Sequence, residues 1–474
     1  MYDVIVIGAG LTGCAVAREL TRYALTVAVL DKGADVAESG LSSAHSGIVG
    51  AAGYDVAVGS YKAELMRRGN ELFAGVCEEL KVPFKHNGAM LLCFDPAGLF
   101  ELQRLTLCGV KNGVTGLRIL DTRALHRMEP SISEQVVYAL YAPMTGITDP
   151  YQLAANYAEN ASQNGAEFFF DTCVKAILRH IKGYWVIKTQ LGTLAARTVV
   201  NAAGLYAGEL NNMVSSKKYN IIPKRTEYIT LDKSCVYTGP TVMIPTKQGV
   251  VTTAPTTAGN VILGCTGEEV HDKESIENTA EGLQNLLYWA EKIWPNMDLH
   301  ALLTSFASNS VQNVPDGLFM GETPEITGLF NAGGGSDDLL CVPAIAEHIA
   351  QKVGQRLDAS QNKDFDPNLP RMMRFRECNI GDQESLIRQD STWGNIVCRC
   401  ELITEYEIRA AIRRSVGARS IDGVKRRCGA GGGHCQGECR VRVAKLLSEE
   451  LGVPIESIKK SADASFAAPW RRHD

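Results

Sequence analysis

The pattern of apolar and polar positions at the start of the chain changes period twice within 30 residues. Residues 3–7 (DVIVI) are almost all apolar and mostly β-branched, which is typical of a buried parallel strand. A helical spacing of apolar residues then runs from about Leu11 to Arg22. A second apolar run, Thr26–Leu30, ends at Asp31. This order predicts a strand–helix–strand unit at the N-terminus.

Two later segments run into small residues, and the first of them has the pattern of a buried strand. Arg197–Asn201 leads into Ala202, Ala203 and Gly204. Residues 328–332 lead into a run of glycines at 333–335, and a helical pattern follows from Pro343 to Val353. A glycine-rich turn before a helix presents unpaired backbone N–H groups, so it favours an electron-rich ligand.

The C-terminal region has a shorter, helical pattern. Thr404 and Glu407 form a capping-box signature for a helix that reaches about Arg414. Ser420 is a suitable cap for a second helix through Arg427, and a third helical pattern ends near residue 451. Because residues 358–393 are charged and polar, we expect them to connect this unit to the rest of the chain.

Composition places the chain among ordinary globular proteins. Its 474 residues are too many for one core, so two or three domains are expected. With 45% hydrophobic and 21% charged residues and a net charge of −5, nothing favours nucleic acid or an anionic membrane as a partner. We find no secretory signal and no run of ~18 apolar residues, and we expect a cytoplasmic protein without a membrane span.

The first turn carries a dinucleotide-binding signature. Gly8, Gly10 and Gly13 form G-x-G-x-x-G between the first strand and the first helix. The glycines allow a tight turn, close approach of a pyrophosphate and close helix–strand packing, while Asp31 can accept from ribose hydroxyls. A similar turn without a nucleotide is the alternative. The motif does not separate NAD from FAD, but the segments at Ala203–Gly204 and 333–336 favour FAD.

The cysteines are unevenly distributed. Nine of the 14 are scattered singly, whereas five lie between Cys398 and Cys439. A C-x-C pair is separated by 34 residues from a C-x₃-C pair, with a glycine-rich loop just before the latter. Residues 397–445 contain eleven Lys or Arg and five Asp or Glu, a local charge of 11 − 5 = +6, which suits an anionic [2Fe–2S] cluster. A structural zinc ion is the main alternative.

These motifs together resemble known families. The first ~360 residues resemble the D-amino-acid-oxidase-like FAD superfamily, and within it the glycerol-3-phosphate dehydrogenase and L-2-hydroxyglutarate dehydrogenase branch. The segments that carry this resemblance are residues 42–55, 223–232, 249–264, 305–307 and 332–346. The cysteine region resembles the bacterioferritin-associated-ferredoxin-like [2Fe–2S] domain, which is found fused behind the catalytic unit of anaerobic glycerol-3-phosphate dehydrogenases.

The resemblance implies an α/β (α+β) fold: a Rossmann-like FAD-binding domain, an interleaved antiparallel-sheet substrate domain and a small helical [2Fe–2S] domain. The expected boundaries are 1–80, 145–215 and 325–360 for the FAD-binding domain, 81–144 and 216–324 for the substrate domain, 361–392 for the connector, 393–455 for the cluster domain and 456–474 for a tail. The expected FAD contacts are Gly8, Gly10, Gly13, Asp31, Lys32, Ser42, Ser43, Ser46, Val174, Ala203, Gly204, Gly334, Ser336 and Leu339. The expected cluster ligands are Cys398, Cys400, Cys435 and Cys439, with Cys428 as a substitute.

The substrate positions depart from the family pattern. His45 stands where relatives carry Asn, and their following His is replaced by Gly50 or Ala51. Ser310 replaces an arginine that holds the substrate's anionic group, and two carboxylates follow Ser336. These changes argue against a small anionic substrate held in the familiar way and leave open a polyol or an amine.

The catalytic candidates are His45, Arg225, Tyr228 and Asp337. His45 has a pKa suited to proton transfer but could instead be a polar residue of the cofactor loop. Asp337 could cap the following helix, and Arg225 and Tyr228 could be sheet-packing residues. The other histidines are interpreted as structural.

The sequence therefore predicts an FAD-dependent dehydrogenase, glycerol-3-phosphate dehydrogenase-like, that oxidises a small polar C–OH or C–N substrate. Electrons would pass from flavin through the cluster to an acceptor protein or membrane-linked subunit, with a hetero-oligomer as one arrangement. The alternatives are an electron-transfer or scaffold subunit with an altered substrate site, and an amine or 2-hydroxy-acid oxidase.

Overall fold

The computed structural model describes residues 1–38, 46–50, 53–247, 249–312, 320–324, 326–333 and 339–461, with the backbone alone at 265, 266 and 312. The chain divides into two discontinuous compact units. Unit 1 comprises Met1–Gly40, Tyr151–Val200 and Val353–Asp474; unit 2 comprises Leu41–Pro150 and Asn201–Lys352. The mixed α/β fold with a helical C-terminal region confirms the predicted fold class. The finer domain boundaries stay a prediction.

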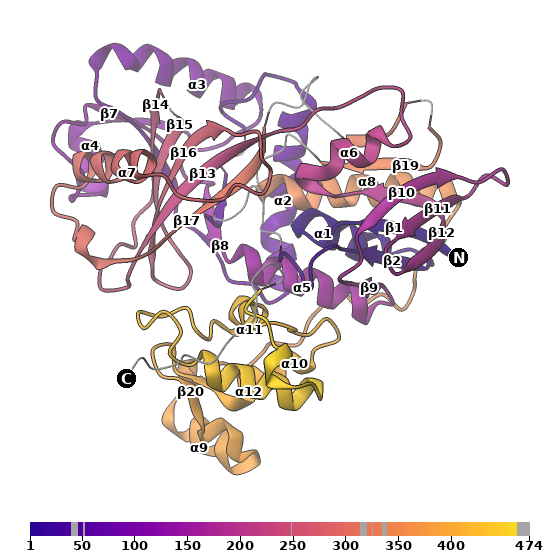
Figure 1. Ribbon diagram of the computed structural model, residues 1–474. Helices are drawn as coiled ribbons and strands as arrows, with labels where there is room; N and C mark the ends of the chain where they lie inside the picture. Colours follow the sequence, from indigo (N-terminus) through magenta and orange to yellow (C-terminus); the bar gives the residue numbers. More distant parts are fainter. Residues whose placement is uncertain are drawn as a thin grey trace. The chain divides into compact units, whose positions relative to one another are not determined.

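Unit 1 contains the sheet that the N-terminal pattern predicts (Figure 1). Its elements are β1 (Tyr2–Ile7), α1 (Leu11–Leu20), β2 (Val27–Leu30), α5 (Pro150–Gln163), β9 (Glu167–Phe169), β10 (Val174–Arg179), β11 (Trp185–Thr189) and β12 (Gly192–Asn201). The strand order is β10-β11-β12-β1-β2-β9, with β1, β2 and β9 parallel and β10 to β12 antiparallel. The centre of β1 is fully buried, as its unbroken apolar run requires.

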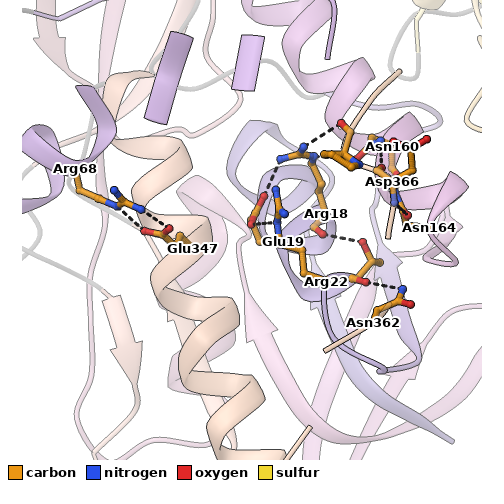
Figure 2. Close-up of polar contacts among 11 residues, drawn as sticks. Arg18, Glu19, Arg22, Arg68, Asn160, Asn164, Glu347, Asn362 and Asp366 are labelled. Carbon is orange, nitrogen blue, oxygen red and sulfur yellow. Dashed lines mark hydrogen bonds and ion pairs between the residues drawn. The ribbon is translucent and has the colours of Figure 1, made fainter. Parts of the chain in front are cut away.

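The connector is fastened to α1 and α5 by a buried polar network (Figure 2). The side chain of Arg18 on α1 is fully buried and donates to the Asn160 side chain at 2.8 Å and to the Pro367 carbonyl at 3.1 Å. Asn160 and Asn164 both donate to the Asp366 carbonyl. The chain that leads to the cluster domain is therefore held against the nucleotide-binding half of unit 1.

Unit 2 is built on a mostly antiparallel sheet of eight strands, in the order β17-β13-β16-β15-β14-β5-β7-β6 (Figure 1). The sheet strands are β5 (Ala89–Cys93), β6 (Arg118–Asp121), β7 (Tyr138–Ala142), β13 (Ile222–Leu231), β14 (Thr241–Thr246), β15 (Gly249–Pro255), β16 (Val261–Glu269) and β17 (Leu302–Gln312). The helices are α2 (Tyr61–Glu79), α3 (Leu99–Lys111), α4 (Thr122–Met128), α6 (Ala207–Asn212) and α7 (Ala280–Ile293). The short strands are β3 (Ile48–Val49), β4 (Phe84–His86), β8 (Gly146–Thr148), β18 (Met320–Glu322) and β19 (Leu329–Ala332).

One face of this sheet packs against α7. Ile229 and Leu231 of β13 share a buried core with Leu286 and Ile293 of α7. Because side chains alternate along a strand, the even-numbered residues of β13 lie on the opposite face. Helix α8 (Val342–Leu357) begins in unit 2, where Glu347 accepts two hydrogen bonds from Arg68 of α2 (Figure 2).

The cluster region has its own small core and belongs to unit 1. Its elements are α9 (Ile380–Gln389), β20 (Ile396–Cys398), β21 (Ile403–Thr404), α10 (Glu405–Arg413), α11 (Ile421–Cys428) and α12 (Arg440–Leu451). The capping box between Thr404 and Glu407 forms as predicted, and Ser420 caps α11 by accepting from the Gly423 N–H. All three predicted helices are confirmed.

A buried ion pair joins α11 to the loop that follows β2. Arg427 donates two hydrogen bonds of 2.6 Å to the carboxylate of Asp35, and the two side chains are 1% and 0% exposed. Arg427 also donates to the carbonyls of Gly423 and Val416, so both of its terminal nitrogens are bonded, whereas its buried Nε has no hydrogen-bond partner among the described residues. The cluster domain is thus anchored to the nucleotide-binding loop within the same unit.

Replacing Arg427 should loosen this anchor. In Arg427→Met, the buried Asp35 carboxylate would keep only the more distant Arg426, at 3.6 Å, as its cation, and this loss costs on the order of 3 kcal/mol. We expect faster hydrogen exchange in residues 31–38 and in α11, measured by mass spectrometry. The control Arg413→Met removes a 63% exposed arginine that pairs with Glu450 inside the cluster domain, and it should leave residues 31–38 unchanged. Equal exchange in Arg427→Met and wild type would contradict the anchoring role.

Candidate functional site

The turn between β1 and α1 has the room and the donors that a diphosphate needs. Gly8 has a φ of 112°, which favours glycine, and its N–H donates to the Leu30 carbonyl. A Cβ built on Gly10 would meet nothing within 4 Å, so there is open space over this loop among the described residues. In the same part of the chain, α1 has neither a side-chain cap nor an acidic residue in its first turn. Its free N–H groups and positive dipole end fit an anion.

Asp31 organises the loops around this turn. Its two carboxylate oxygens accept from the backbone N–H groups of Ala9 at 2.5 Å and Gly33 at 2.7 Å. Burial raises the pKa of Asp31, whereas these two hydrogen bonds oppose that rise. Each carboxylate oxygen keeps a second lone pair, so Asp31 can hold the loop and still accept from a ribose hydroxyl. The residues present fit the adenosine end of a dinucleotide.

The four predicted cluster ligands lie together in two pairs. The thiol of Cys439 is hydrogen-bonded to Cys398, and this bond lowers the pKa of Cys398 to about 6. Cys400 is hydrogen-bonded to Cys435, which raises the pKa of Cys400. Within the described residues, no three His, Cys, Asp or Glu side chains converge on a single metal ion. The two pairs supply four thiols, and four cysteine thiolates are the ligand set of a [2Fe–2S] cluster, with two sulfurs for each iron.

The glycine-rich loop fits tightly around these thiols. The backbone N–H of Gly431, which has a φ of 88°, is hydrogen-bonded to the sulfur of Cys398. A Cβ on Gly433 would collide with the Cβ of Cys400, so the backbone comes as close to this ligand as glycine allows. Backbone N–H groups directed at thiolate sulfurs stabilise the negative charge of a bound cluster. The donor set and its cradle fit a [2Fe–2S] cluster.

Comparison with known proteins agrees with both sites. The model of the family described as "FAD dependent oxidoreductase" matches residues 3–352, and that of the "BFD-like [2Fe-2S] binding domain" matches residues 396–449. The chain belongs to the FAD-dependent oxidoreductase family. FAD and a [2Fe–2S] cluster are therefore its cofactors.

The relatives of this oxidoreductase include several enzymes with related names. A glycerol 3-phosphate dehydrogenase of Caloramator mitchellensis is 38% identical over 474 residues, covering 98% of each chain. An L-2-hydroxyglutarate dehydrogenase of Arabidopsis thaliana is 27% identical over 74% of this chain and 83% of its own. The structure of the L-α-glycerophosphate oxidase of Mycoplasma pneumoniae with FAD bound has a TM-score of 0.71 and 21% identity, covering 78% of this chain and 99% of that one. Within the described residues of this oxidoreductase, none of the helices has the length and apolar character that crossing a bilayer requires.

The other predicted FAD contacts are spread over both units. Val174 begins β10, and the residues just before it hydrogen-bond to the backbone of Asp31 and Gly33. Ala203 and Gly204 follow β12, the neighbour of β1, and Gly204 has a φ of 53°. The remaining described contacts are Lys32, which follows Asp31, Ser46, whose hydroxyl accepts from the Ile48 N–H, and Leu339, which is buried at the entry to α8. The predicted contacts Ser42, Ser43, Gly334 and Ser336 lie outside the described residues.

The described catalytic candidates lie on opposite faces of β13. Arg225 shares the α7 face, where it pairs with Glu268 at 2.6 Å and lies 3.8 Å from Glu227. Tyr228 is on the other face and stacks on Phe306 of β17 with ring centroids 5.0 Å apart. The two side chains therefore do not meet in one site. The candidates His45 and Asp337 lie outside the described residues.

The sequence interpretation missed some residues near the cofactor sites. The Nε2 atom of His434 lies 3.6 Å from the Cys400 sulfur, so calling this histidine structural overlooked its position. Because His434 directly precedes Cys435 in the sequence, its proximity to the thiols could have been predicted. Cys428 is buried in the domain core and donates to the Val424 carbonyl, and burial raises its pKa to about 12. The described geometry favours a core role for this thiol.

Substitution of Gly10 should abolish flavin binding. The side chain in Gly10→Val would fill the open space where the diphosphate approaches the backbone. We expect purified protein without the yellow colour and flavin absorbance of wild type. Gly75 on α2 also has nothing within 4 Å of its Cβ position, so Gly75→Val is the matched control and should keep its flavin. Full flavin content in Gly10→Val would contradict the assigned site.

Loss of a ligand thiol should remove iron and spare flavin. We expect about two irons per chain in anaerobically prepared protein, with an EPR signal on reduction. Cys398→Ser and Cys435→Ser should lose that iron but retain flavin, whereas Cys428→Ser should keep both. Iron loss in Cys428→Ser together with iron retention in Cys439→Ser would show that the ligand set is wrong. Stoichiometric zinc without iron would show that these thiols bind zinc and not a [2Fe–2S] cluster.

Proposed function

We propose that this protein is a glycerol 3-phosphate dehydrogenase whose electrons leave through the C-terminal cluster domain. The observation that carries the proposal is 38% identity to a glycerol 3-phosphate dehydrogenase over 98% of both chains. That likeness includes the cluster region as well as the FAD-binding part. A relative that matches over nearly the whole of both chains is stronger support than the partial matches to 2-hydroxy-acid enzymes.

The proposed reaction converts a secondary alcohol to a ketone. The C–H bond at carbon 2 breaks and its hydride leaves, while the hydroxyl proton passes to a base and a C=O bond forms. Flavin supplies the two-electron acceptor for this step, and an external electron-accepting protein or quinone-linked subunit is the final oxidant. The protein's contribution is to hold the nucleotide at the N-terminus of α1 and to orient the alcohol.

The cluster domain supports an exit for single electrons. Its thiols are gathered in two pairs beside glycine N–H groups, and its segment from 397 to 445 carries an excess of Lys and Arg. The Asp35–Arg427 pair ties this domain to the loop that holds Asp31. A one-electron centre in the flavin-binding unit suits a dehydrogenase that transfers electrons to a partner protein. We propose a protein of this class as the electron acceptor.

This proposal departs from the substrate expected from the sequence. The replacement of an arginine by Ser310 argued for a neutral or cationic substrate. The similarity to a glycerol 3-phosphate dehydrogenase over the whole chain is the stronger evidence on the substrate. The replacement of one arginine by Ser310 leaves other positions of the sheet that can supply a cation. An electron-transfer subunit without its own substrate remains the competing function, and it makes a different prediction.

Anaerobic mixing with substrate separates these two functions. Glycerol 3-phosphate should bleach the flavin absorbance of the isolated chain within seconds, and dye-linked turnover should follow. L-2-hydroxyglutarate and glycerol, at equal concentrations, are the comparison substrates and should react much more slowly. If only L-2-hydroxyglutarate bleaches the flavin, the substrate assignment changes to that compound. No bleaching by any of the three, in protein that dithionite can reduce, would favour the electron-transfer subunit.

A further inference from the structure

The face of the unit 2 sheet that points away from α7 is polar at its β17-β13-β16 end. On β13 this face carries Lys224, Thr226 and Tyr228, and their partners in register on β17 are Ser310, Ser308 and Phe306. The hydroxyls of Ser310 and Thr226 donate to the carbonyls of Lys224 and Ser308 across the strand pair. This face therefore carries hydroxyl side chains, two of which already donate to backbone carbonyls, and one aromatic stack. The other face carries the Arg225–Glu268 ion pair and, farther along β13, the core residues Ile229 and Leu231.

Two glycines of β16 make room for the larger side chains of this face. A Cβ on Gly264 would collide with the ring of Tyr228, and a Cβ on Gly267 would collide with Cε and Nζ of Lys224. Gly267 is the register partner of Thr226, so the lysine chain leans along the sheet from residue 224 toward Tyr228. The ammonium group is thus held over β16, on the same side as the Tyr228–Phe306 stack.

Lys224 also supplies a positive charge on the face of β13 that carries Tyr228. Arg225, its neighbour on β13, lies on the α7 side and is paired with Glu268. Across the described side chains of β13, β16 and β17, Lys224 is the one Lys or Arg on the face of Tyr228. A phosphate group needs a cation and hydroxyl or N–H donors, and lysine meets the first need as a point charge.

We propose that Lys224 binds the anionic group of the substrate and so sets the preference for a phosphorylated alcohol. The inference rests on the proposed function for the identity of that substrate. Ser310, directly opposite Lys224 in the register, stands where the sequence pattern led us to expect an arginine. In this chain the positive charge therefore stands on β13, at Lys224, and not at the opposite position on β17, so the site still offers a cation to an anionic group. Lys224 acts in binding and positioning, and takes no proton in the reaction.

A structural role for Lys224 is the alternative. Glu269 of β16 is its other partner in register, so the lysine could serve as one half of a cross-strand charge pair. Loss of such a pair would lower stability but would not discriminate between substrates with and without phosphate. The deciding experiment must therefore measure anion affinity separately from folding.

The experiment compares wild type with Lys224→Met, which keeps the length of the side chain and removes its charge. We expect the KM for glycerol 3-phosphate to rise by roughly tenfold to a hundredfold, the loss typical of a charge-assisted hydrogen bond. The value of kcat should change by less than about threefold, because a positioning contact is made equally in ground and transition states. The inhibition constant of inorganic phosphate, measured as a competitive inhibitor, should rise in parallel.

Three further variants make the result specific. Lys224→Arg should keep the wild-type KM, and the double variant Lys224→Met with Ser310→Arg should recover much of it, because the new cation lies on the partner position. Lys188→Met, which alters an exposed lysine of β11 in unit 1, should change neither constant. Flavin content and urea unfolding confirm that each variant is folded.

The outcomes distinguish this inference from the proposed function. If wild type oxidises glycerol 3-phosphate and Lys224→Met has the same KM and phosphate inhibition, the role of Lys224 is wrong and the function stands. If wild type does not oxidise it, but inorganic phosphate perturbs the flavin spectrum and Lys224→Met abolishes that effect, the function is wrong and the anion site stands. No phosphate effect in folded, substrate-inactive wild type would overturn both.

Discussion

The buried ion pair between Asp35 and Arg427 is the constraint on which the organisation of unit 1 depends. Both side chains are almost fully withdrawn from water, and a buried pair of charges is tolerated when its mutual attraction and further hydrogen bonds offset the lost hydration. The loop that carries Asp35 is itself bonded to the first turn, because the Ala37 N–H donates to the Ala9 carbonyl. Arg427, at the other end, is followed by Cys428 and the glycine loop beside Cys398. This pair, together with the contacts of Arg426 to Asp35 and Glu38 and of Ser420 to Glu38, thus connects the loop after β2 to the helix that precedes the glycine loop.

Several of the groups that this protein is expected to bind are anionic, and different protein groups stabilise each of them. The diphosphate is met by the N-terminus of α1 and by glycines that leave the backbone open. The thiolates are met by N–H groups of a glycine loop in a basic segment. The proposed substrate phosphate is met by a lysine laid over a glycine of β16. In all of them the absence of a Cβ creates the close approach, which explains why glycines mark the functional sites.

Local patterns made much of this fold predictable. The βαβ unit and the capping box at Thr404 follow from short-range spacing, and the structure has them within about two residues of the predicted positions. The four thiols were predictable because they are close in sequence and share one chemistry. Asp35 and Arg427 were not, since each lies in a polar segment and they are 392 residues apart. The separation of Arg225 and Tyr228 could have been foreseen, because three residues along a strand lead to opposite faces.

The central claim is that electrons taken from glycerol 3-phosphate reach the cluster domain. It is tested most directly by anaerobic freeze-quench EPR on the full chain after mixing with glycerol 3-phosphate. We predict bleached flavin together with the signal of a reduced [2Fe–2S] centre, and bleached flavin without that signal in Cys398→Ser. A wild-type protein whose flavin is reduced by the substrate while its intact cluster stays oxidised, although dithionite can reduce it, would contradict the account.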